Sequence, residues 1–192
     1  MDSSDRISGL YPYRDKSDAA IYARAIAAMR AGNLDLSRIG TLTLTVRNPQ
    51  NPYYYELLGD IEYQYGHYDD SIKAYEKSLD LLSKTADKSQ IQTALALVLS
   101  ERGKDGDNAR AIEFCKLAIL TEPTPLAYYV LSRAEQSRGN SGISDWAMAE
   151  YYNLLKNEAK IKKYAKSAQK KLSKKSPEYL KSGDLLDNDL NK

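Results

Sequence analysis

Only a few residue types in this chain could support catalysis, and its single histidine is the first to consider. His67 stands next to Gly66, in a stretch that reads as a tight turn. A relay built on several histidines, a multi-histidine metal site and the HExxH zinc motif are all absent from the 192-residue sequence. We therefore expect His67 to be a solvated turn residue, and the sequence predicts no catalytic residue, no cofactor and no metal site.

The other reactive groups also have simple structural explanations. Cys115 stands alone, so it cannot form a disulfide within the chain, and its place in a repeated helical pattern predicts a buried core residue. The acidic pair Asp69 and Asp70 opens a predicted helix, where the helix dipole favours negative charge. Neither a GxxxxGK(S/T) loop nor a GxGxxG motif is present to bind phosphate. The chain itself is therefore expected not to be an enzyme.

A run of lysines near the C-terminus is the strongest charge feature. Nine lysines lie between Lys156 and Lys175, and Glu158 is the only acidic residue among them. Nucleic acid, anionic lipid or an acidic protein could use such a helix face. The run contains no arginine and little exposed aromatic interleaving, and the net charge of the whole chain is only +2. We expect a solvated outer face and no nucleic-acid partner, and we favour that face over a membrane contact through this helix.

The helices that must position these residues are clearest between residues 52 and 83. Two amphipathic patterns meet there at a turn that contains Gly66. Aromatic, leucine and small positions follow in a fixed order and are filled by Tyr55, Leu58, Gly59, Ser71, Tyr75 and Ser78. This order resembles a tetratricopeptide repeat (TPR), in which small residues let two antiparallel helices approach and large residues fill the space beside them. Glu62 departs from the pattern, because an aromatic residue is usual at that position.

The same unit recurs along the chain, with turn glycines at Gly32, Gly66, Gly103 and Gly139. We predict an all-α fold, a right-handed TPR superhelix of about four helix pairs plus extra C-terminal helices. A lead-in segment covers 1–16 and a TPR domain covers 17–174, followed by a short helix and frayed tail over 175–192. The predicted units of the TPR domain are 17–49, 52–83, 88–123 and 125–156, followed by a helix over 158–174.

Two stretches leave the secondary structure less certain. The sequence SRIGTLTLTV, residues 37–46, alternates threonine with apolar residues and could suggest a strand, but the repeat register favours a helix. Residues 140–144 read as a loop that precedes a helix over 145–155. That helix could complete the fourth unit or begin a final one.

In a TPR, the first helix of each pair lines a concave groove, at positions offset from those that pack. The resemblance therefore implies a peptide, an extended protein segment or a neighbouring domain as the partner. The set of lysine and asparagine residues with which some TPRs bind the C-terminal carboxylate of chaperones is missing. Carried onto this chain, the groove positions include Tyr22, Arg30, Tyr53, Glu56, Asp60, Tyr63, Gln64, Glu101, Tyr129, Arg133 and Gln136.

Three stretches resemble a narrower family. NPYYYELLGDI, LSRAEQSRGN and DWAMAEYYNLLKNEAKIKKYAKSAQKKL with SPEYL are similar to the C-terminal TPR region of bacterial zinc metallopeptidases of the cell envelope. The resemblance implies a noncatalytic region that binds substrates or partners, or regulates an N-terminal peptidase domain of the same polypeptide, in periplasmic protein quality control. The chain has no signal peptide at its start, which leaves a cytoplasmic location open. The alternative is a free-standing TPR adaptor or scaffold that binds a peptide in its groove.

Overall fold

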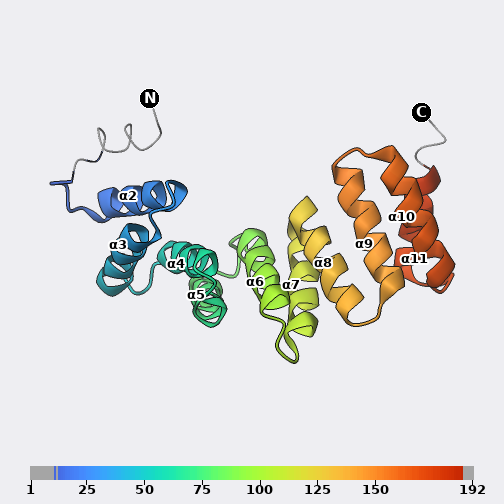
Figure 1. Cartoon of the computed structure of the whole chain (residues 1–192), viewed down its shortest axis with the longest axis horizontal. Helices are drawn as coiled ribbons and strands as arrows, with labels where there is room; N and C mark the ends of the chain where they lie inside the picture. The colour runs from blue at the N-terminus through green and yellow to red at the C-terminus, as the bar shows by residue number, and fades with distance from the viewer. Residues whose placement is uncertain (1–10, 12, 188–192) are drawn as a thin grey trace. The chain divides into compact units, whose positions relative to one another are not determined.

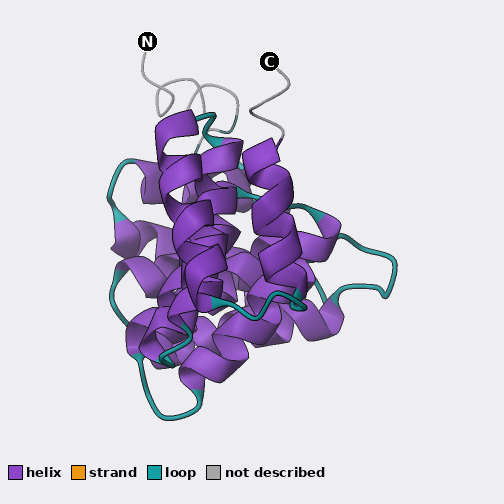
Figure 2. Ribbon diagram, turned by 90° about the vertical axis from the view of Figure 1, so that its right-hand side faces the viewer, coloured by secondary structure: helices purple, strands orange, loops and turns teal. Residues whose placement is uncertain are grey.

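The computed structural model describes residue 11 and residues 13–187, and this part of the chain consists of ten α-helices and no strands (Figures 1 and 2). The all-α prediction is thus confirmed. The predicted lead-in lies mostly outside the described residues, as do residues 188–192 of the predicted frayed tail. The helices are α2 (Asp18–Arg30), α3 (Leu34–Arg47), α4 (Pro52–Gln64), α5 (Tyr68–Leu81), α6 (Ser89–Arg102), α7 (Asp107–Thr121), α8 (Pro125–Ser137), α9 (Ser141–Leu154), α10 (Glu158–Lys171) and α11 (Pro177–Asp187).

The chain forms two compact units, which divide between Ala86 and Asp87. In unit 1 (Met1–Ala86), α2 pairs with α3, α4 pairs with α5, and α3 packs against α4. In unit 2 (Asp87–Lys192), successive helices pack along the sequence from α6 to α11, and α9 contacts both α8 and α10. The helix that carries Trp146 therefore belongs to both neighbouring pairs. The assignment of repeat units within 17–174 stays a prediction.

The turn glycines lie where the repeat predicts them. Gly32, Gly66, Gly103 and Gly139 follow the first helix of their pairs and have φ angles of 76°, 77°, 64° and 81°. A residue with a Cβ is strained in this left-handed region, whereas glycine is not. These four predictions are confirmed, and the glycines let each first helix stop and the chain reverse.

Helix α3 settles the choice between strand and helix. Its threonines do not leave their hydroxyl groups without partners, because each hydroxyl bonds within the helix itself. Asn33 caps the start of α3 by accepting a hydrogen bond from the backbone N–H of Leu36 at 3.1 Å. The threonine hydroxyls donate at 2.9 Å from Thr41 to the carbonyl of Ser37, from Thr43 to that of Ile39 and from Thr45 to that of Leu42.

A repeated serine contact joins the two helices of each pair in unit 1. The hydroxyl of Ser37 donates to the carbonyl of Ala25, and the hydroxyl of Ser71 donates to the carbonyl of Gly59, both at 2.8 Å. Both serines are fully buried, and the two contacts lie one 34-residue repeat apart. The ring of Tyr75 lies against Gly59, since a Cβ added to Gly59 would come within 2.6 Å of two ring carbons. Small and large residues thus interlock as predicted.

The packing of α4 differs in part from the pattern. Tyr55 and Leu58 were expected to pack in the interior, but the structure leaves both half-buried, and Tyr54, Leu57 and Ile61 are buried instead. The hydroxyl of Tyr55 donates to the carbonyl of Pro49 at 3.2 Å. The correction follows from helix geometry, because Leu57 and Ile61 lie one turn apart on the face that meets α2 residue Ala25.

The predicted loop over 140–144 is wrong. Helix α9 begins at Ser141, two residues after the turn glycine Gly139, and the hydroxyl oxygen of its Ser144 lies 2.9 Å from that of Ser132 in α8. A Cβ at Gly142 would come within 2.8 Å of the side chain of Leu172, so glycine serves a close helix approach there. Helix α10 also ends earlier than predicted, at Lys171.

Candidate partner-binding surface

Unit 1 brings together three of the predicted groove residues, one from α2 and two from α4. Glu56 and Asp60 are spaced four residues apart, so they lie on the same face of α4. Tyr22 of α2 stands next to α4, with its ring centroid 5.5 Å from that of Tyr54. The hydroxyl of Tyr75 donates to Oδ1 of Asp60 at 2.6 Å. The packing of α2, α4 and α5 therefore fixes the side chains of this acidic, tyrosine-lined surface.

Partial burial changes the acidity of this surface. Loss of contact with water raises the pKa of Glu56, and the nearby charge of Asp60 raises it further. Desolvation also raises the pKa of Asp60, although its hydrogen bond from Tyr75 opposes that shift. Burial raises the pKa of Tyr22 as well, with the charges of Glu56 and Asp60 adding to the effect. Two carboxylates in a poorly solvated setting attract a cationic group strongly.

The remaining predicted groove residues fall in both units. In unit 1, Tyr63 is half-buried, whereas Arg30, Tyr53 and Gln64 are exposed. In unit 2, Glu101 of α6 is half-buried, and α8 carries the exposed residues Tyr129, Arg133 and Gln136. The guanidinium of Arg133 lies 6.0 Å from the ring centroid of Tyr129. The assignment of these residues to one partner-binding groove stays a prediction.

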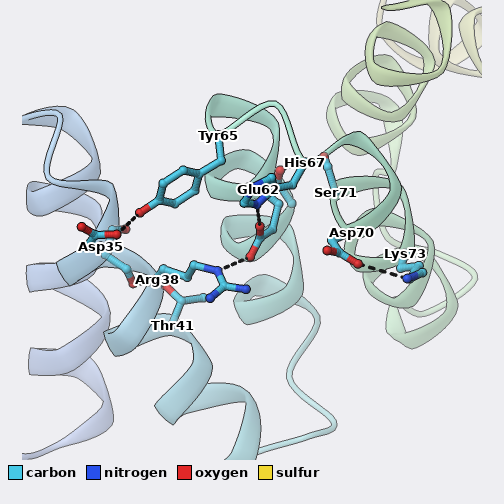
Figure 3. Close-up of polar contacts among 11 residues, drawn as sticks. Asp35, Arg38, Thr41, Glu62, Tyr65, His67, Asp70, Ser71 and Lys73 are labelled. Atoms are coloured by element: carbon cyan, nitrogen blue, oxygen red, sulfur yellow. Dashed lines mark hydrogen bonds and ion pairs between the residues drawn. The ribbon is translucent and has the colours of Figure 1, made fainter. Parts of the chain in front are cut away.

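A buried polar cluster in unit 1 was not foreseen. The side chain of Glu62 is only 3% exposed, and its two oxygens contact Arg38 Nε at 2.5 Å and His67 Nδ1 at 2.8 Å (Figure 3). The ring of Tyr65 stacks on that of His67, and its hydroxyl donates to Asp35. The cluster joins α3, α4 and the turn before α5. Its one sequence signal was a glutamate where the TPR pattern has an aromatic residue.

His67 therefore has a partner that the sequence did not reveal. It lies in the turn before α5, where its side chain is 54% exposed, as a solvated turn residue would be. Its ring nevertheless helps to satisfy the buried Glu62 carboxylate. Asp69 and Asp70 lie in the first turn of α5, as predicted, and Asp70 pairs with Lys73 at 3.0 Å. His67 and the acidic pair therefore have structural roles in this turn and helix start.

Cys115 is a core residue, as predicted. It lies in α7, fully buried, and desolvation raises the pKa of its thiol to about 12. We expect a thiol-specific reagent at about pH 8 to label the native chain very slowly, because an ordinary free thiol has a pKa of about 8.5. Labelling should become fast when denaturant unfolds the chain. Rapid labelling of the native chain, measured by mass spectrometry, would contradict this description of Cys115.

Neither a metal-binding cluster nor a membrane-spanning helix is found among the described residues. Among them, no group of three or more histidine, cysteine, aspartate or glutamate side chains is placed to hold a metal ion. No helix in this part of the chain is both long and apolar enough to cross a membrane.

Comparison with solved structures identifies the fold. The crystal structure of MamA matches with a TM-score of 0.65 and 16% sequence identity, over 82% of this chain and 87% of that one. Cut9, in the APC/C Cut9–Hcn1 hetero-tetramer, matches with a TM-score of 0.68 and 15% identity, over 97% of this chain and 35% of that one. TTC0263, a thermophilic TPR protein of Thermus thermophilus, matches with a TM-score of 0.59 and 19% sequence identity, over 85% of this chain and 86% of that one.

Sequence comparison gives a narrower match. No protein-family model matches the chain. Superkiller complex protein 3 of Homo sapiens is 34% identical over 92 residues, which is 48% of this chain but only 6% of that protein. The structural likenesses establish a TPR-like helical repeat fold, in agreement with the repeat pattern of the sequence.

Proposed function

We propose that this chain is a noncatalytic protein-interaction module that binds an extended segment of a partner along the α2–α4 surface of unit 1. The TPR-like repeat fold supports an interaction role, since helical repeats commonly present extended binding surfaces. The observation that carries the proposal is the half-buried carboxylate pair Glu56 and Asp60 beside Tyr22. A bound cationic side chain is the best explanation for two carboxylates held together in so poorly solvated a setting.

The partner segment should therefore carry lysine or arginine with apolar residues beside it. A cationic side chain would reach Glu56 and Asp60, while its neighbours would contact the ring of Tyr22. Both carboxylates are half-buried in the free chain, and this desolvation raises the pKa of each. Binding of the partner therefore removes less water from Glu56 and Asp60 than it would from fully exposed carboxylates. A positive charge on the partner then contributes more to affinity than it would on an open surface.

The proposal extends to a larger protein. The C-terminal stretches DWAMAEYYNLLKNEAKIKKYAKSAQKKL and SPEYL support a place as the C-terminal, partner-binding or regulatory region of a zinc metallopeptidase in the cell envelope. The coding sequence upstream of Met1 tests this directly. An in-frame peptidase domain with an HExxH motif is the expected finding, whereas a stop codon immediately upstream would favour the free-standing adaptor instead.

Reversing the charge of one residue tests the proposed α2–α4 surface. Glu56→Lys should weaken the binding of a labelled, lysine-rich peptide by about tenfold or more, because it places a positive charge where the partner's cation would lie. Fluorescence anisotropy measures the affinity. The control is Asp80→Lys, which makes the same charge change at an exposed position of α5. An equal loss of affinity in the two variants would show only a long-range charge effect and would contradict binding at the α2–α4 surface.

A further inference from the structure

Unit 2 carries a row of tyrosines that crosses three helices. Tyr129 lies on α8, Tyr151 and Tyr152 lie on α9, and Tyr164 lies on α10. Successive ring centroids along this row are 5.9, 4.8 and 5.5 Å apart. The three helices lie side by side in Figure 1 and pack in sequence order. The rings therefore form one continuous aromatic surface, of which Tyr129 is exposed and the other three are half-buried.

Three cations accompany these rings. Arg133 lies 6.0 Å from the ring centroid of Tyr129, and Lys163 Nζ lies 5.4 Å from that of Tyr164. Lys160 Nζ lies 4.5 Å from the centroid of Tyr152 and donates a hydrogen bond to its hydroxyl at 3.1 Å. We call these four tyrosines and three cations the basic aromatic strip. Only Tyr164 belongs to the lysine run itself, and the strip draws its other three rings from α8 and α9.

The lysines of α10 are not equivalent to one another. Lys171 bonds Asp145 of α9 at 2.5 Å, so its charge is balanced within unit 2. The contacts that the structure describes for Lys160 and Lys163 are with tyrosine side chains instead. The hydrogen bond with Tyr152 raises the pKa of Lys160, which keeps that ammonium charged at neutral pH. The α10 part of the strip is therefore positively charged.

The acidic residues of α8, α9 and α10 do not neutralise it. Glu135 is buried and accepts a hydrogen bond from Asn140 at 2.6 Å, while Asp145 is engaged with Lys171 and Ser167. Glu150 is half-buried, and desolvation raises its pKa. Glu158 is exposed in the first turn of α10, where it complements the helix dipole. In the contacts that the structure describes, none of these four carboxylates pairs with Arg133, Lys160 or Lys163.

We propose that the basic aromatic strip binds an extended acidic segment of a partner protein. Aspartate or glutamate side chains of that segment pair with Arg133, Lys160 and Lys163, and its apolar side chains lie against the edges of the tyrosine rings. The tyrosine hydroxyls supply hydrogen bonds to the segment's backbone. This surface is chemically opposite to the acidic α2–α4 surface of unit 1, and it does not depend on it.

The geometry favours a protein segment over nucleic acid. Nucleobases bind single-strand sites by stacking on open aromatic faces. Here Tyr152 and Tyr164 stack on one another with an interplanar angle of 17°, and Lys160 lies over the Tyr152 ring. Few ring faces remain open for bases. The ring edges, hydroxyls and cations that remain match carboxylates and amide groups instead.

Matched charge reversals in the full chain test the proposal. The probe is a short fluorescein-labelled peptide that alternates glutamate with phenylalanine, and anisotropy gives its affinity. Lys160→Glu with Lys163→Glu should weaken binding by about tenfold or more. Lys170→Glu with Lys174→Glu makes the same charge change at exposed positions outside the strip and should alter binding by less than about twofold. Tyr129→Ala, at an exposed position, should weaken binding severalfold.

Several outcomes would overturn the proposal. Equal weakening by the two lysine pairs would show that the peptide senses only diffuse charge. Tight binding of a single-stranded oligonucleotide or of anionic lipid vesicles, with no binding of the acidic peptide, would assign the strip to another class of partner. Circular dichroism confirms that each variant is folded. Glu56→Lys should leave the affinity for the acidic peptide unchanged. The test of the basic aromatic strip is therefore independent of the test of the α2–α4 surface.

Discussion

Replacing Gly59 with alanine is expected to destabilise unit 1 by about 2 kcal/mol. The new Cβ would lie 2.6 Å from two ring carbons of Tyr75, far inside van der Waals contact. Tyr75 is only 2% exposed, and its hydroxyl is held by Asp60, so the ring has little room to move. Such overpacking costs about 3 kcal/mol, and alanine's better helix propensity offsets about 1 kcal/mol of it.

Gly40→Ala is the matched control, because Gly40 is also a helical glycine of unit 1. Its added Cβ would lie 3.4 Å from the Cβ of Ala25, which is ordinary contact. This variant should be neutral or slightly stabilising. Urea unfolding measures the free-energy differences, and hydrogen exchange in α4 and α5 locates them. Partial rescue of Gly59→Ala by Tyr75→Leu is also expected, and equal stabilities of the two alanine variants would contradict the close approach of Gly59 to Tyr75.

Replacing Arg38 with methionine should destabilise unit 1 by about 3 kcal/mol. The Glu62 carboxylate would remain buried, with His67 as its one partner shown in Figure 3. This cost lies at the lower end of the range for a broken buried pair, because Arg38 is 43% exposed. Glu62→Met should cost less, about 1–2 kcal/mol, since the guanidinium it leaves behind can turn toward water.

A double-mutant cycle checks this asymmetry. Once Glu62→Met is present, Arg38→Met should add little further destabilisation, because no buried charge is left to compensate. Lys116→Met is the comparison in unit 2. Lys116 Nζ lies 4.0 Å from Oε1 of the buried Glu135, which keeps its hydrogen bond from Asn140. That variant should therefore cost much less than Arg38→Met, and additive effects of Arg38 and Glu62 would refute their coupling.

The fold was largely predictable because its signals are local. A glycine with positive φ lies at the turn within each of the four predicted helix pairs, and Ser37 and Ser71 repeat with the 34-residue spacing of a TPR. The repeat register correctly outweighed strand propensity in α3, whose threonines satisfy their hydroxyls within the helix. The predicted helix start at residue 145 is wrong, because the sequence alone does not show that Gly142 lies in a helix and packs against Leu172.

The side-chain clusters were harder to predict, because they join residues from several helices. Glu62 lies 24 residues from Arg38, and periodicity does not say that their side chains meet. The basic aromatic strip is similar, since Tyr129 and Tyr164 come from helices two apart in the sequence order. For the α2–α4 surface, the TPR pattern named Tyr22, Glu56 and Asp60 as groove residues, and the structure places these three together. Its use by a partner stays a prediction.

The interlocking of Gly59 with Tyr75 has a consequence for how the helices find their proper neighbours. In a chain built on a 34-residue period, helices could pair wrongly during folding. Helix α5 could take the place of α3 beside α2, or α3 could take the place of α5 beside α4. One repeat earlier, the same two positions hold Ala25 and Thr41. Tyr75 opposite Ala25 would meet a methyl group where it needs open space, and Thr41 opposite Gly59 would leave a void. We therefore expect the matched sizes of Gly59 and Tyr75 to favour the native helix pairs over such mispaired ones.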